Sequence, residues 1–314
     1  MFGDGFTCRG NYPVAGRTYT NGKGEVFDWT TCKTERQWYT LGYLVKEGHR
    51  GFTAYTNGTC NGRAQYFTPD DVHYCPDTIK AMEKESAQEK RKEREERQRV
   101  RTERLQLFKD EKKRMAKELR NFPNKGRFFL FFDTETTGLH KDDGVVQLAW
   151  LLTDKENTEL MRASHITNPG FITSDSSRAT AVHHITQERI EKEGVSIYSA
   201  IGELDAVAHH FNPVLVAHNI PFDMGKLEHH AREMGSRTFL RDVSETVCTM
   251  ESGTEFCAIE TDWGLKWPSL QELHVKLFGL KYTEAHDAMA DVEACRKCFF
   301  ELSRLGVIKT LPHP

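Results

Sequence analysis

Two acidic residues in the second half of the sequence have the spacing needed to share a metal ion. Asp133 and Glu135 follow directly on the apolar run at residues 128–132. If that run is a strand, alternation sends both carboxylates to one face, where their repulsion is costly unless they share a cation. Acidic residues also lead buried strands into polar loops without any chemical role. For this pair alone, a metal site and a simple strand end are equally good interpretations.

Other candidates for the same site lie where helices are predicted to begin. Asp223 comes two residues after Pro221, which suits a first helical turn, although a carboxylate there can simply favour the helix dipole. Asp291 is predicted in the first turns of a helix capped by Asp287. His286 then lies on the approaching loop, and the alternative for it is a cap or surface histidine.

Together these side chains could hydrolyse a phosphodiester. Cleavage brings hydroxide to an anionic phosphorus and stabilises a leaving alkoxide, which two divalent ions can do together. Carboxylate oxygens suit two Mg²⁺, or Mn²⁺, and four carboxylates with two such ions make a neutral cluster. A histidine with an ordinary pKa of about 6.5 suits a general base. The predicted metal ligands are Asp133, Glu135, Asp223 and Asp291, and the predicted base is His286.

The order and context of these residues resemble the motifs of a known family. As they stand here, the motifs are Asp133-x-Glu135, His218-Asn219-x-x-Phe222-Asp223 and His286-x4-Asp291. They are similar to those of the DEDDh, or DnaQ-like, 3′→5′ exonucleases, the family of polymerase proofreading subunits, over about residues 126–305. Further agreement comes from residues 136–139 and from residues 181–186, where His184 replaces a glycine that is common in the family.

The resemblance implies a metal-dependent 3′→5′ exonuclease that acts on single-stranded or frayed nucleic acid, with DNA as the leading substrate. His286 would take a proton from the attacking water, and Glu135 would lie near the 3′-hydroxyl. The loop after Glu135 would receive the terminal nucleotide, and Leu139 would wedge against the last base unless it is an ordinary core residue. The predicted substrate-binding residues are Thr136, Thr137, Gly138, Leu139, His218 and Asn219.

Two other functions remain open from the sequence. An RNA-trimming 3′→5′ exoribonuclease is one, because a contact to the 2′-hydroxyl has no recognisable motif. A non-cutting module that binds nucleic acid or a polymerase is the other, and the loss of any acidic residue would favour it. All four acids are present, which favours an enzyme.

The elements that must position these residues follow a mixed pattern from residue 126 to residue 314. Strands are predicted at 127–132, 145–152, 161–167 and 214–217, and helices at 197–211, 221–234, 269–278 and 288–305. Strands come first and then alternate with helices, which indicates a mixed α/β sheet flanked by helices. The resemblance implies that this sheet is RNase H-like. Asp142 and Asp143 are expected in a solvated loop.

Two further parts are predicted before this domain. Residues 1–80 are rich in Thr, Gly and aromatic residues and have Asn-Gly turn signals between short runs, which indicates a small β-rich domain of unknown role. Residues 81–120 contain 25 charged groups and neither Gly nor Pro, so residues 81–125 are predicted to form a long charged helical linker. An apolar stripe in its second half packs on the following domain or, alternatively, forms an oligomer through residues 105–122. The stripe consists of Leu105, Phe108, Met115, Leu119 and Phe122.

The net charge of −3 is unevenly distributed along the chain. Residues 121–314 carry 19 basic and 28 acidic groups, a balance of −9. Such a segment attracts a phosphate-rich partner only if something positive, such as bound metal ions, reverses the local field. The predicted partners are the 3′ ends of nucleic acid and, further, a polymerase or another replication, repair or defence protein.

Cysteine content and hydropathy restrict the location. Eight cysteines in 314 residues are too few for a disulfide scaffold. No apolar run reaches the ~18 residues of a membrane span, and the first residues do not resemble a signal peptide. A cytoplasmic protein without membrane contact is therefore expected. A structural Zn²⁺ in the N-terminal domain is a weaker alternative to buried thiols, because the usual Cys-x2-Cys pair is absent. Its ligands would be Cys8, Cys32, Cys60 and Cys75, with His73.

Overall fold

The computed structural model describes residues 18–20, 26–28, 31–55, 63–170, 177–238, 240, 242–243 and 245–309. The chain divides into two compact units, Met1–Glu96 and Arg97–Pro314, and each is described by itself. The domain boundaries predicted near residues 80 and 125 stay predictions.

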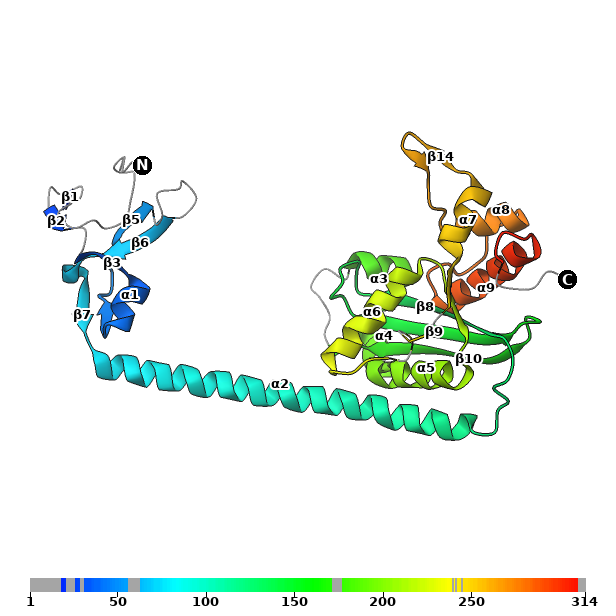
Figure 1. Cartoon of the computed structure of the whole chain (residues 1–314), viewed down its shortest axis with the longest axis horizontal. Coiled ribbons are helices and arrows are strands. Elements are labelled where there is room, and N and C mark those ends of the chain that lie inside the picture. Colours follow the sequence, from blue (N-terminus) through cyan, green and yellow to red (C-terminus); the bar gives the residue numbers. More distant parts are fainter. Residues whose placement is uncertain are drawn as a thin grey trace. The chain divides into compact units, whose positions relative to one another are not determined.

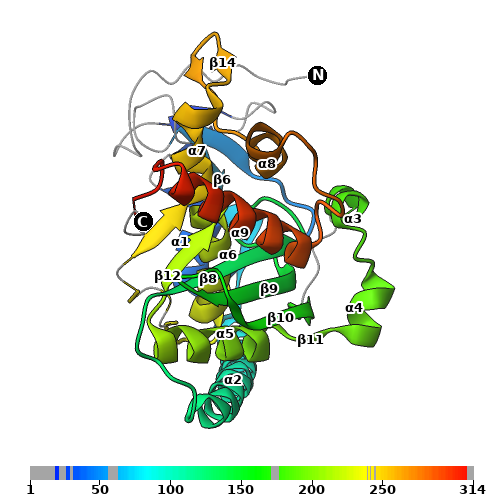
Figure 2. The same ribbon diagram turned by 90° about the vertical axis from the view of Figure 1, so that its right-hand side faces the viewer.

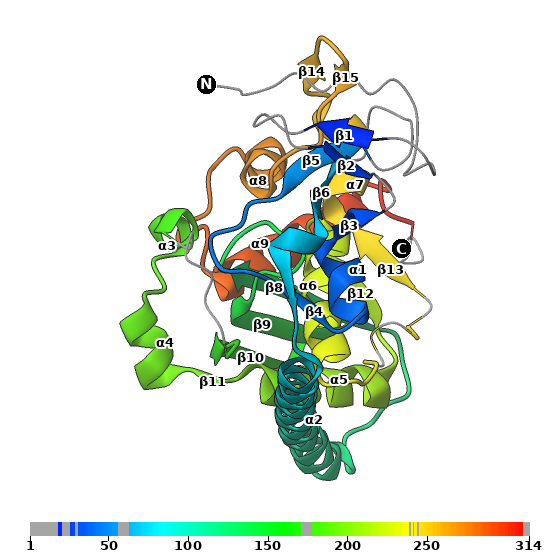
Figure 3. The same cartoon turned by 90° about the vertical axis from the view of Figure 1, so that its left-hand side faces the viewer.

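The first unit contains short strands and a short helix around a small apolar core (Figure 3). The indole of Trp38 is buried with Phe67 and Val72, and it donates a hydrogen bond to the Phe67 carbonyl at 2.9 Å. Helix α1 (Glu35–Thr40) begins with a capping box at Thr34. The described part of this unit is β-rich, as predicted. Its strands are β1 (Thr18–Thr20), β2 (Val26–Asp28), β3 (Lys33–Thr34), β4 (Tyr43–Val45), β5 (Phe52–Tyr55), β6 (Arg63–Phe67) and β7 (Val72–Tyr74).

Helix α2 (Pro76–Leu119) is the long charged helix that the composition predicts. From Arg97 onward it belongs to the second unit. There the side chains of Phe108, Met115 and Leu119 are buried in that unit's core, with Leu105 packed against them. The apolar stripe therefore packs on its own chain, as predicted, and these side chains are not available for the alternative of an oligomer through residues 105–122.

Two positions of the stripe differ from the rest. Lys112 occupies a polar slot within it and donates a hydrogen bond to the fully buried carboxylate of Asp205 at 2.6 Å. Phe122 is 46% exposed, so its predicted place in the stripe is wrong, because the helix already ends at Leu119. No helix in the described part of the chain has the uninterrupted apolar stretch that a bilayer crossing requires.

A six-stranded mixed sheet forms the centre of the second unit (Figure 1). Its strand order is β11–β10–β9–β8–β12–β13, in which β9 is antiparallel to both β8 and β10, whereas β12 is parallel to β8 and β13. All four predicted strands are present, which confirms the mixed sheet. The strands are β8 (Phe128–Thr136), β9 (Val145–Asp154), β10 (Glu159–Asn168), β11 (Val195–Ser196), β12 (Val214–Ala217) and β13 (Thr246–Cys248).

Helices cover both faces of this sheet (Figure 2). The second half of α2 packs with α5 (Ile197–Phe211) and α6 (Ile220–Glu233) on Phe128, Leu130 and Phe132 of β8. On the other face, α7 (Thr249–Cys257), α8 (Leu270–Phe278) and α9 (Ala288–Arg304) pack on Phe129 and Phe131. Alternation along β8 therefore decides which layer of helices each side chain meets.

Apolar periodicity does not predict several short elements of the second unit. These are α3 (Ser177–His183), α4 (Gln187–Glu193) and a hairpin of β14 (Glu260–Thr261) and β15 (Gly264–Leu265). His184 follows α3 with a φ of 59°, a left-handed conformation that favours glycine. Its N–H donates to the Thr180 carbonyl at 2.8 Å. This histidine therefore adopts a backbone conformation that suits the glycine common in the resembled family.

Candidate active site

Strand β8 carries two acidic side chains out of the core at its carboxyl end. Phe129 and Phe131 point to the layer of α7, α8 and α9, and Asp133 and Glu135 continue the same alternation. Thr134, between them, points to the opposite face, which α6 covers. Both acids are partly exposed although the residues before them are buried. They therefore leave the core beside α9.

Asp223 lies in the first turn of α6, where Pro221 is one of the first two residues, as predicted. It is 2% exposed. Its Oδ1 accepts hydrogen bonds from the backbone N–H of Thr134 at 3.0 Å and from Thr134 Oγ1 at 2.7 Å. The residue between the two acids of β8 therefore fixes the orientation of Asp223.

The start of α9 is attached to the sheet through a glutamine. Asp287 is the N-cap, as predicted, and its Oδ1 accepts from the backbone N–H groups of Met289 and Ala290. Gln147, directly opposite Glu135 in the β8–β9 register, donates to Asp287 Oδ2 at 3.0 Å. Its Oε1 accepts from the first residue of α9 at 3.2 Å. These bonds fix the beginning of α9 beside the carboxyl end of β8.

Glu135, His286 and Asp291 meet at one point. A ligand atom of each lies within 4.8 Å of the other two, and no other group of three such ligands occurs among the described residues. The backbone N–H of His286 donates to Asp291 Oδ2 at 3.1 Å, and the Tyr282 hydroxyl donates to Asp291 Oδ1. His286 has a φ of 71°, an uncommon conformation for a residue with a side chain. A loop histidine and a helix carboxylate are thus brought to the end of β8.

Burial and crowding raise the pKa of each carboxyl in the cluster. Burial, followed by the charges of the other three carboxylates, raises the pKa of Asp133 well above its usual value. Burial and the charges of its neighbours raise the pKa of Glu135 to about 8. Burial also raises the pKa of Asp223 and of Asp291, although the hydrogen bonds described above oppose both shifts. The four carboxyls therefore lie close enough for their charges to act on one another.

Divalent cations fit this arrangement. Within the described residues, no Lys or Arg side chain forms an ion pair with any of the four acids, so their charges act on one another. Nearby positive charge favours ionised carboxyls and would lower these raised pKa values. Carboxylate oxygens are the ligands that Mg²⁺ and Mn²⁺ prefer. The donor set of Asp133, Glu135, Asp223 and Asp291 is therefore chemically suited to such ions.

The loop after β8 is closed by its own hydrogen bonds. The Thr137 N–H donates to the Gly144 carbonyl at 2.9 Å, and the Gly144 N–H donates to Thr137 Oγ1 at 3.0 Å. Thr136 Oγ1 donates to the Gly138 carbonyl at 2.8 Å. Leu139 is 87% exposed, which excludes the alternative of a core residue. The predicted contact of this loop with a terminal nucleotide stays a prediction.

Asp143 is buried, so the expectation of a solvated loop is wrong for this residue. It is 5% exposed, and its Oδ2 accepts a hydrogen bond from the His140 N–H at 2.7 Å. The charge of Asp143 also acts on the buried ammonium of Lys226. The side chain of Asp142, by contrast, is 68% exposed. The sequence does not reveal which acid of the pair turns inward.

The ring of His218 already has partners on both nitrogens. Nδ1 lies 3.0 Å from Thr249 Oγ1, and Nε2 lies 3.0 Å from the Pro268 carbonyl oxygen. Burial lowers the pKa of His218 to about 4, so the neutral ring donates from Nε2. Asn219 precedes α6 with a φ of 69° and no side-chain cap bond. His218 therefore anchors the segments around α7 and α8, and its predicted contact with substrate, like that of Asn219, stays a prediction.

No metal-ligand group forms among the N-terminal cysteines that the structure describes. Cys32 is buried and Cys75 is partly buried, and neither joins His73 in a group of three ligands. Cys8 and Cys60 lie outside the described residues. The zinc alternative therefore stays a prediction.

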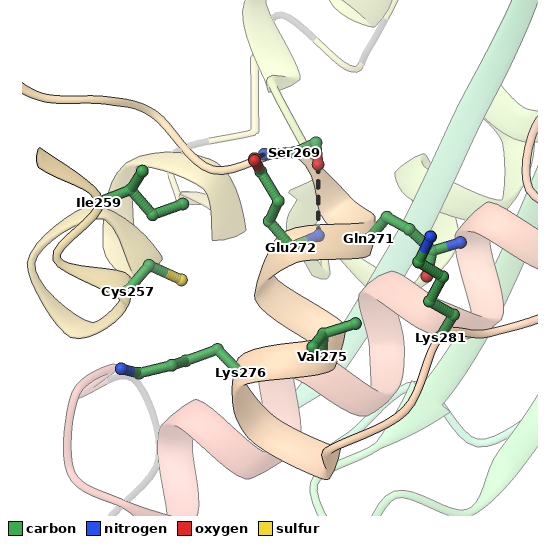
Figure 4. A pocket seen from close by; sticks show the side chains of 8 residues that line it. All are labelled: Cys257, Ile259, Ser269, Gln271, Glu272, Val275, Lys276 and Lys281. Atoms are coloured by element: carbon green, nitrogen blue, oxygen red, sulfur yellow. Dashed lines mark hydrogen bonds between the residues drawn. The ribbon is translucent and has the colours of Figure 1, made fainter. Parts of the chain in front are cut away.

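A pocket of about 470 Å³ lies beside α7 and α8 (Figure 4). Its lining includes Cys257, Val275, Lys276 and Lys281. The hydrogen bond that Figure 4 marks, from the Glu272 N–H to Ser269 Oγ at 3.2 Å, belongs to the N-cap of α8. None of the four acids or His286 lines this pocket, so it is separate from the carboxylate cluster.

Three residues that orient the cluster were not among the predicted site residues. The position of Thr134 could have been predicted, since alternation along the strand sends its side chain to the face opposite the acids. Gln147 carries a local signal, because it is the buried amide in the otherwise apolar run 145–152. Tyr282 has no local signal, because its role depends on how the loop before α9 folds back.

One protein family and several solved structures are similar to this chain. The family model described as exonuclease (RNase_T) matches residues 130–299, whereas no curated protein matches the chain. One similar solved structure is that of exonuclease I, with 19% identity and a TM-score of 0.49. The match covers 56% of this chain and 41% of the exonuclease I chain. E. coli exonuclease I with a dT13 oligonucleotide has 20% identity and a TM-score of 0.49, covering 57% and 41%. This chain thus spans about two fifths of their length. By the family match over more than half of its residues, the chain belongs to the DEDDh-type exonuclease family.

Proposed function

We propose that the protein is a metal-dependent 3′→5′ exonuclease that removes nucleotides from the 3′ ends of single-stranded or frayed DNA. The observation that carries this proposal is that Glu135, His286 and Asp291 meet at one point. Asp133 and Asp223 lie close enough for their charges to act on the other carboxyls. Family membership supports nuclease chemistry, and the polarity and the preference for DNA follow from the family resemblance of the motifs.

Four side chains are proposed to hold two Mg²⁺ or Mn²⁺ ions: Asp133, Glu135, Asp223 and Asp291. When bound, such ions supply positive charge at the scissile phosphate, activate water and stabilise the leaving oxygen. The chain contributes the orientation of the ligands. Thr134 holds one oxygen of Asp223, and Tyr282 and the His286 N–H hold the two oxygens of Asp291.

His286 is proposed to take a proton from the attacking water. Its exposed ring lies within 4.8 Å of carboxylate oxygens of Glu135 and Asp291, so it borders the site from the solvent side. Its backbone is tied to Asp291, one of the proposed metal ligands. A general base must lie within hydrogen-bond reach of the attacking water, directly or through one further water. General base catalysis typically contributes about 10²- to 10⁴-fold in rate.

The loop after β8 is proposed to receive the 3′-terminal nucleotide. Glu135 would lie near the 3′-hydroxyl, and the exposed side chain of Leu139 would pack against the last base. The second half of the chain carries an excess of negative charge, so ions in the cluster would also help to attract the phosphate backbone. A protein partner in replication, repair or defence and a cytoplasmic location stay predictions.

Degradation of labelled oligonucleotides tests the proposal. The purified chain is incubated with 5′-labelled DNA and RNA strands and Mg²⁺, beside the Asp223→Ala and His286→Ala variants and a reaction with EDTA. The expected result is a ladder of shortened 5′-labelled DNA strands that EDTA and both variants abolish. Equal degradation by the variants would contradict the assigned roles, and selective shortening of RNA would replace DNA as the substrate.

A further inference from the structure

We propose that Lys226 is a positioning residue that holds the loop after β8 so that Leu139 projects toward the substrate. The inference rests on the proposed function, which assigns substrate binding to that loop. Lys226 belongs to no motif of the resembled family, and the sequence gives no reason to connect it with residues almost 90 positions earlier.

The ammonium group of Lys226 binds two carbonyl oxygens of this loop. Nζ donates to the Gly138 carbonyl at 2.8 Å and also to the His140 carbonyl. The residue is 3% exposed, an unusual situation for lysine, which is almost never fully buried without partners. Its two hydrogen bonds to the loop backbone hold the ammonium group there, and none joins it to the nearby carboxylate of Asp223.

The two bound carbonyls flank one exposed apolar side chain. Leu139 lies between Gly138 and His140, and it is 87% exposed. Because the carbonyls of the residues before and after Leu139 are bound to one buried ammonium group, the backbone on each side of Leu139 is fixed. Lys226 therefore determines the direction in which Leu139 leaves the protein.

Asp143 holds the same turn from the other side. Its Oδ2 accepts from the His140 N–H at 2.7 Å, and a Cβ added to Gly138 would lie 2.5 Å from that same oxygen. The tight approach explains why glycine is needed at position 138. Burial lowers the pKa of Lys226, and the charge of Asp143 opposes this shift. A buried cation and a buried anion thus enclose the loop.

Helix α6 connects this arrangement with the carboxylate cluster. Asp223 and Lys226 are three positions apart and therefore on the same side of the helix. One rigid element positions a proposed metal ligand and the loop that would contact the terminal base. A correct distance between these two groups matters because small misplacements of a substrate can reduce a rate by about 10²-fold.

Two substrates separate the role of the loop from that of the cluster. A single-stranded DNA oligonucleotide has a terminal base stacked on its neighbour, whereas the p-nitrophenyl ester of thymidine 5′-monophosphate has no neighbouring nucleotide. Lys226→Met is expected to reduce kcat/KM on the oligonucleotide by roughly 10- to 100-fold and to affect the ester far less. Arg232→Met is the matched control, since it removes an exposed cation from the same helix.

Leu139→Ala tests the consequence of the contact. It is expected to cause the same selective loss, and the double variant is expected to be no worse than either single variant, because both changes act on one feature. Equal loss on both substrates would overturn the inference, since Lys226 would then act through the cluster or the fold. Gly138→Ala, which disturbs the loop from the side of Asp143, provides a second test if Lys226→Met does not fold.

Hydrogen exchange tests the inference without any measurement of activity. The amide protons of Thr137 and His140 are bonded within the loop, and Lys226→Met is expected to accelerate their exchange more than that of the central strands. Unchanged exchange would overturn the inference. If the wild-type protein cleaves neither substrate, the proposed function fails, and the exchange rates alone decide whether Lys226 orders the loop.

Discussion

The two ends of α6 present carboxylates in opposite surroundings, one buried at Asp223 and one partly buried at Glu233. Glu233, the last residue of the helix, lies beside Arg104, Tyr198 and His230. Burial works to raise its pKa, yet the hydrogen bonds from His230 and Tyr198 and the charge of Arg104 outweigh it and bring the pKa to about 2. This end of the helix therefore contains the countercharge that its acid requires.

Asp223, in the first turn, lies among three other acids. Burial and then the charge of Asp291 raise its pKa, and the hydrogen bonds from Thr134 and from the Asp223 backbone oppose the shift. A carboxylate withdrawn from solvent is therefore by itself no sign of a functional site. What distinguishes the first turn from the last is that Asp223 has no ion pair with any residue that the structure describes: its charge acts on Lys226, but the hydrogen bonds of that ammonium group go to the loop backbone. Bound cations would supply the missing partner.

The largest expected difference between the two ends is in catalysis. Asp223→Asn is expected to lower kcat by on the order of 10³-fold or more, because it removes a ligand from ions that contribute several kcal/mol of charge stabilisation. Glu233→Gln, at the other end of the same helix, is expected to retain activity. Rates on a 5′-labelled DNA oligonucleotide measure both. Comparable losses in the two variants would mean that the contrast between the ends has no functional meaning.

Metal ions are expected to stabilise the protein in a pH-dependent manner. In the metal-free protein the pKa of Glu135 is about 8, against an ordinary value of 4.5. Its contribution to stability is therefore complete below pH 4.5 and lost as the pH rises through about 8. Ions that bind the ionised carboxylate of Glu135 should restore the stability that is lost.

Thermal melting with and without Mg²⁺ measures that effect. At a concentration of about 100 times Kd, an ion adds about 2.7 kcal/mol, which corresponds to roughly 5 to 10 °C for a unit of this size. The gain is expected at pH 8.5 and is expected to be small at pH 5, with Na⁺ at equal ionic strength as the control. A gain that is equal at both pH values would contradict the assignment.

Tyr282→Phe is expected to weaken metal binding by about 10- to 100-fold, the usual effect of removing a hydrogen bond to a ligand. Its hydroxyl donates to Asp291 Oδ1, and the substitution leaves the aromatic ring in place. Titration calorimetry with Mn²⁺ measures the affinity, and Tyr74→Phe, which changes an exposed tyrosine, is the control. Unchanged affinity in Tyr282→Phe would show that this bond does not orient the ligand.

The smallest effect is expected at the last turn of α6. Glu233→Gln is expected to lower the free energy of unfolding by about 1 to 2 kcal/mol at pH 7, because it removes charge-assisted hydrogen bonds. The pKa of Glu233 is lower in the folded state than its ordinary 4.5, so its contribution is present above pH 4.5 and lost as the pH falls toward about 2. Urea unfolding at several pH values measures this. A difference that grows as the pH falls would contradict the assignment.

The strands and helices that carry the site could be predicted well where the apolar pattern of the sequence is continuous. Strand β12 and helix α5 have the predicted bounds, because long apolar runs and helical periodicity are local signals. The N-cap role of Asp287 is also local. Strand β8 extends through both acids to Thr136, beyond its predicted end, because pairing with β9 continues after the apolar run stops.

Contacts between distant segments could not be predicted in the same way. Lys226 binds carbonyls 86 and 88 positions away, and Gln147 binds Asp287 140 positions away. No local periodicity encodes such pairs, since they depend on how helices pack on the sheet. The inward turn of Asp143 follows from the same packing. The sequence therefore predicted the types of the reactive groups better than the residues that hold them in place.

Calorimetric titration of the metal-free protein with Mn²⁺ at pH 8 tests the central claim most directly. The claim is that four converging acids lack the positive charge that they need. Wild-type protein is expected to bind two ions per chain with release of protons, and Asp223→Asn is expected to lose at least one of them, while Glu233→Gln binds as the wild type does. Absence of binding, or the same two ions in Asp223→Asn, would contradict the account.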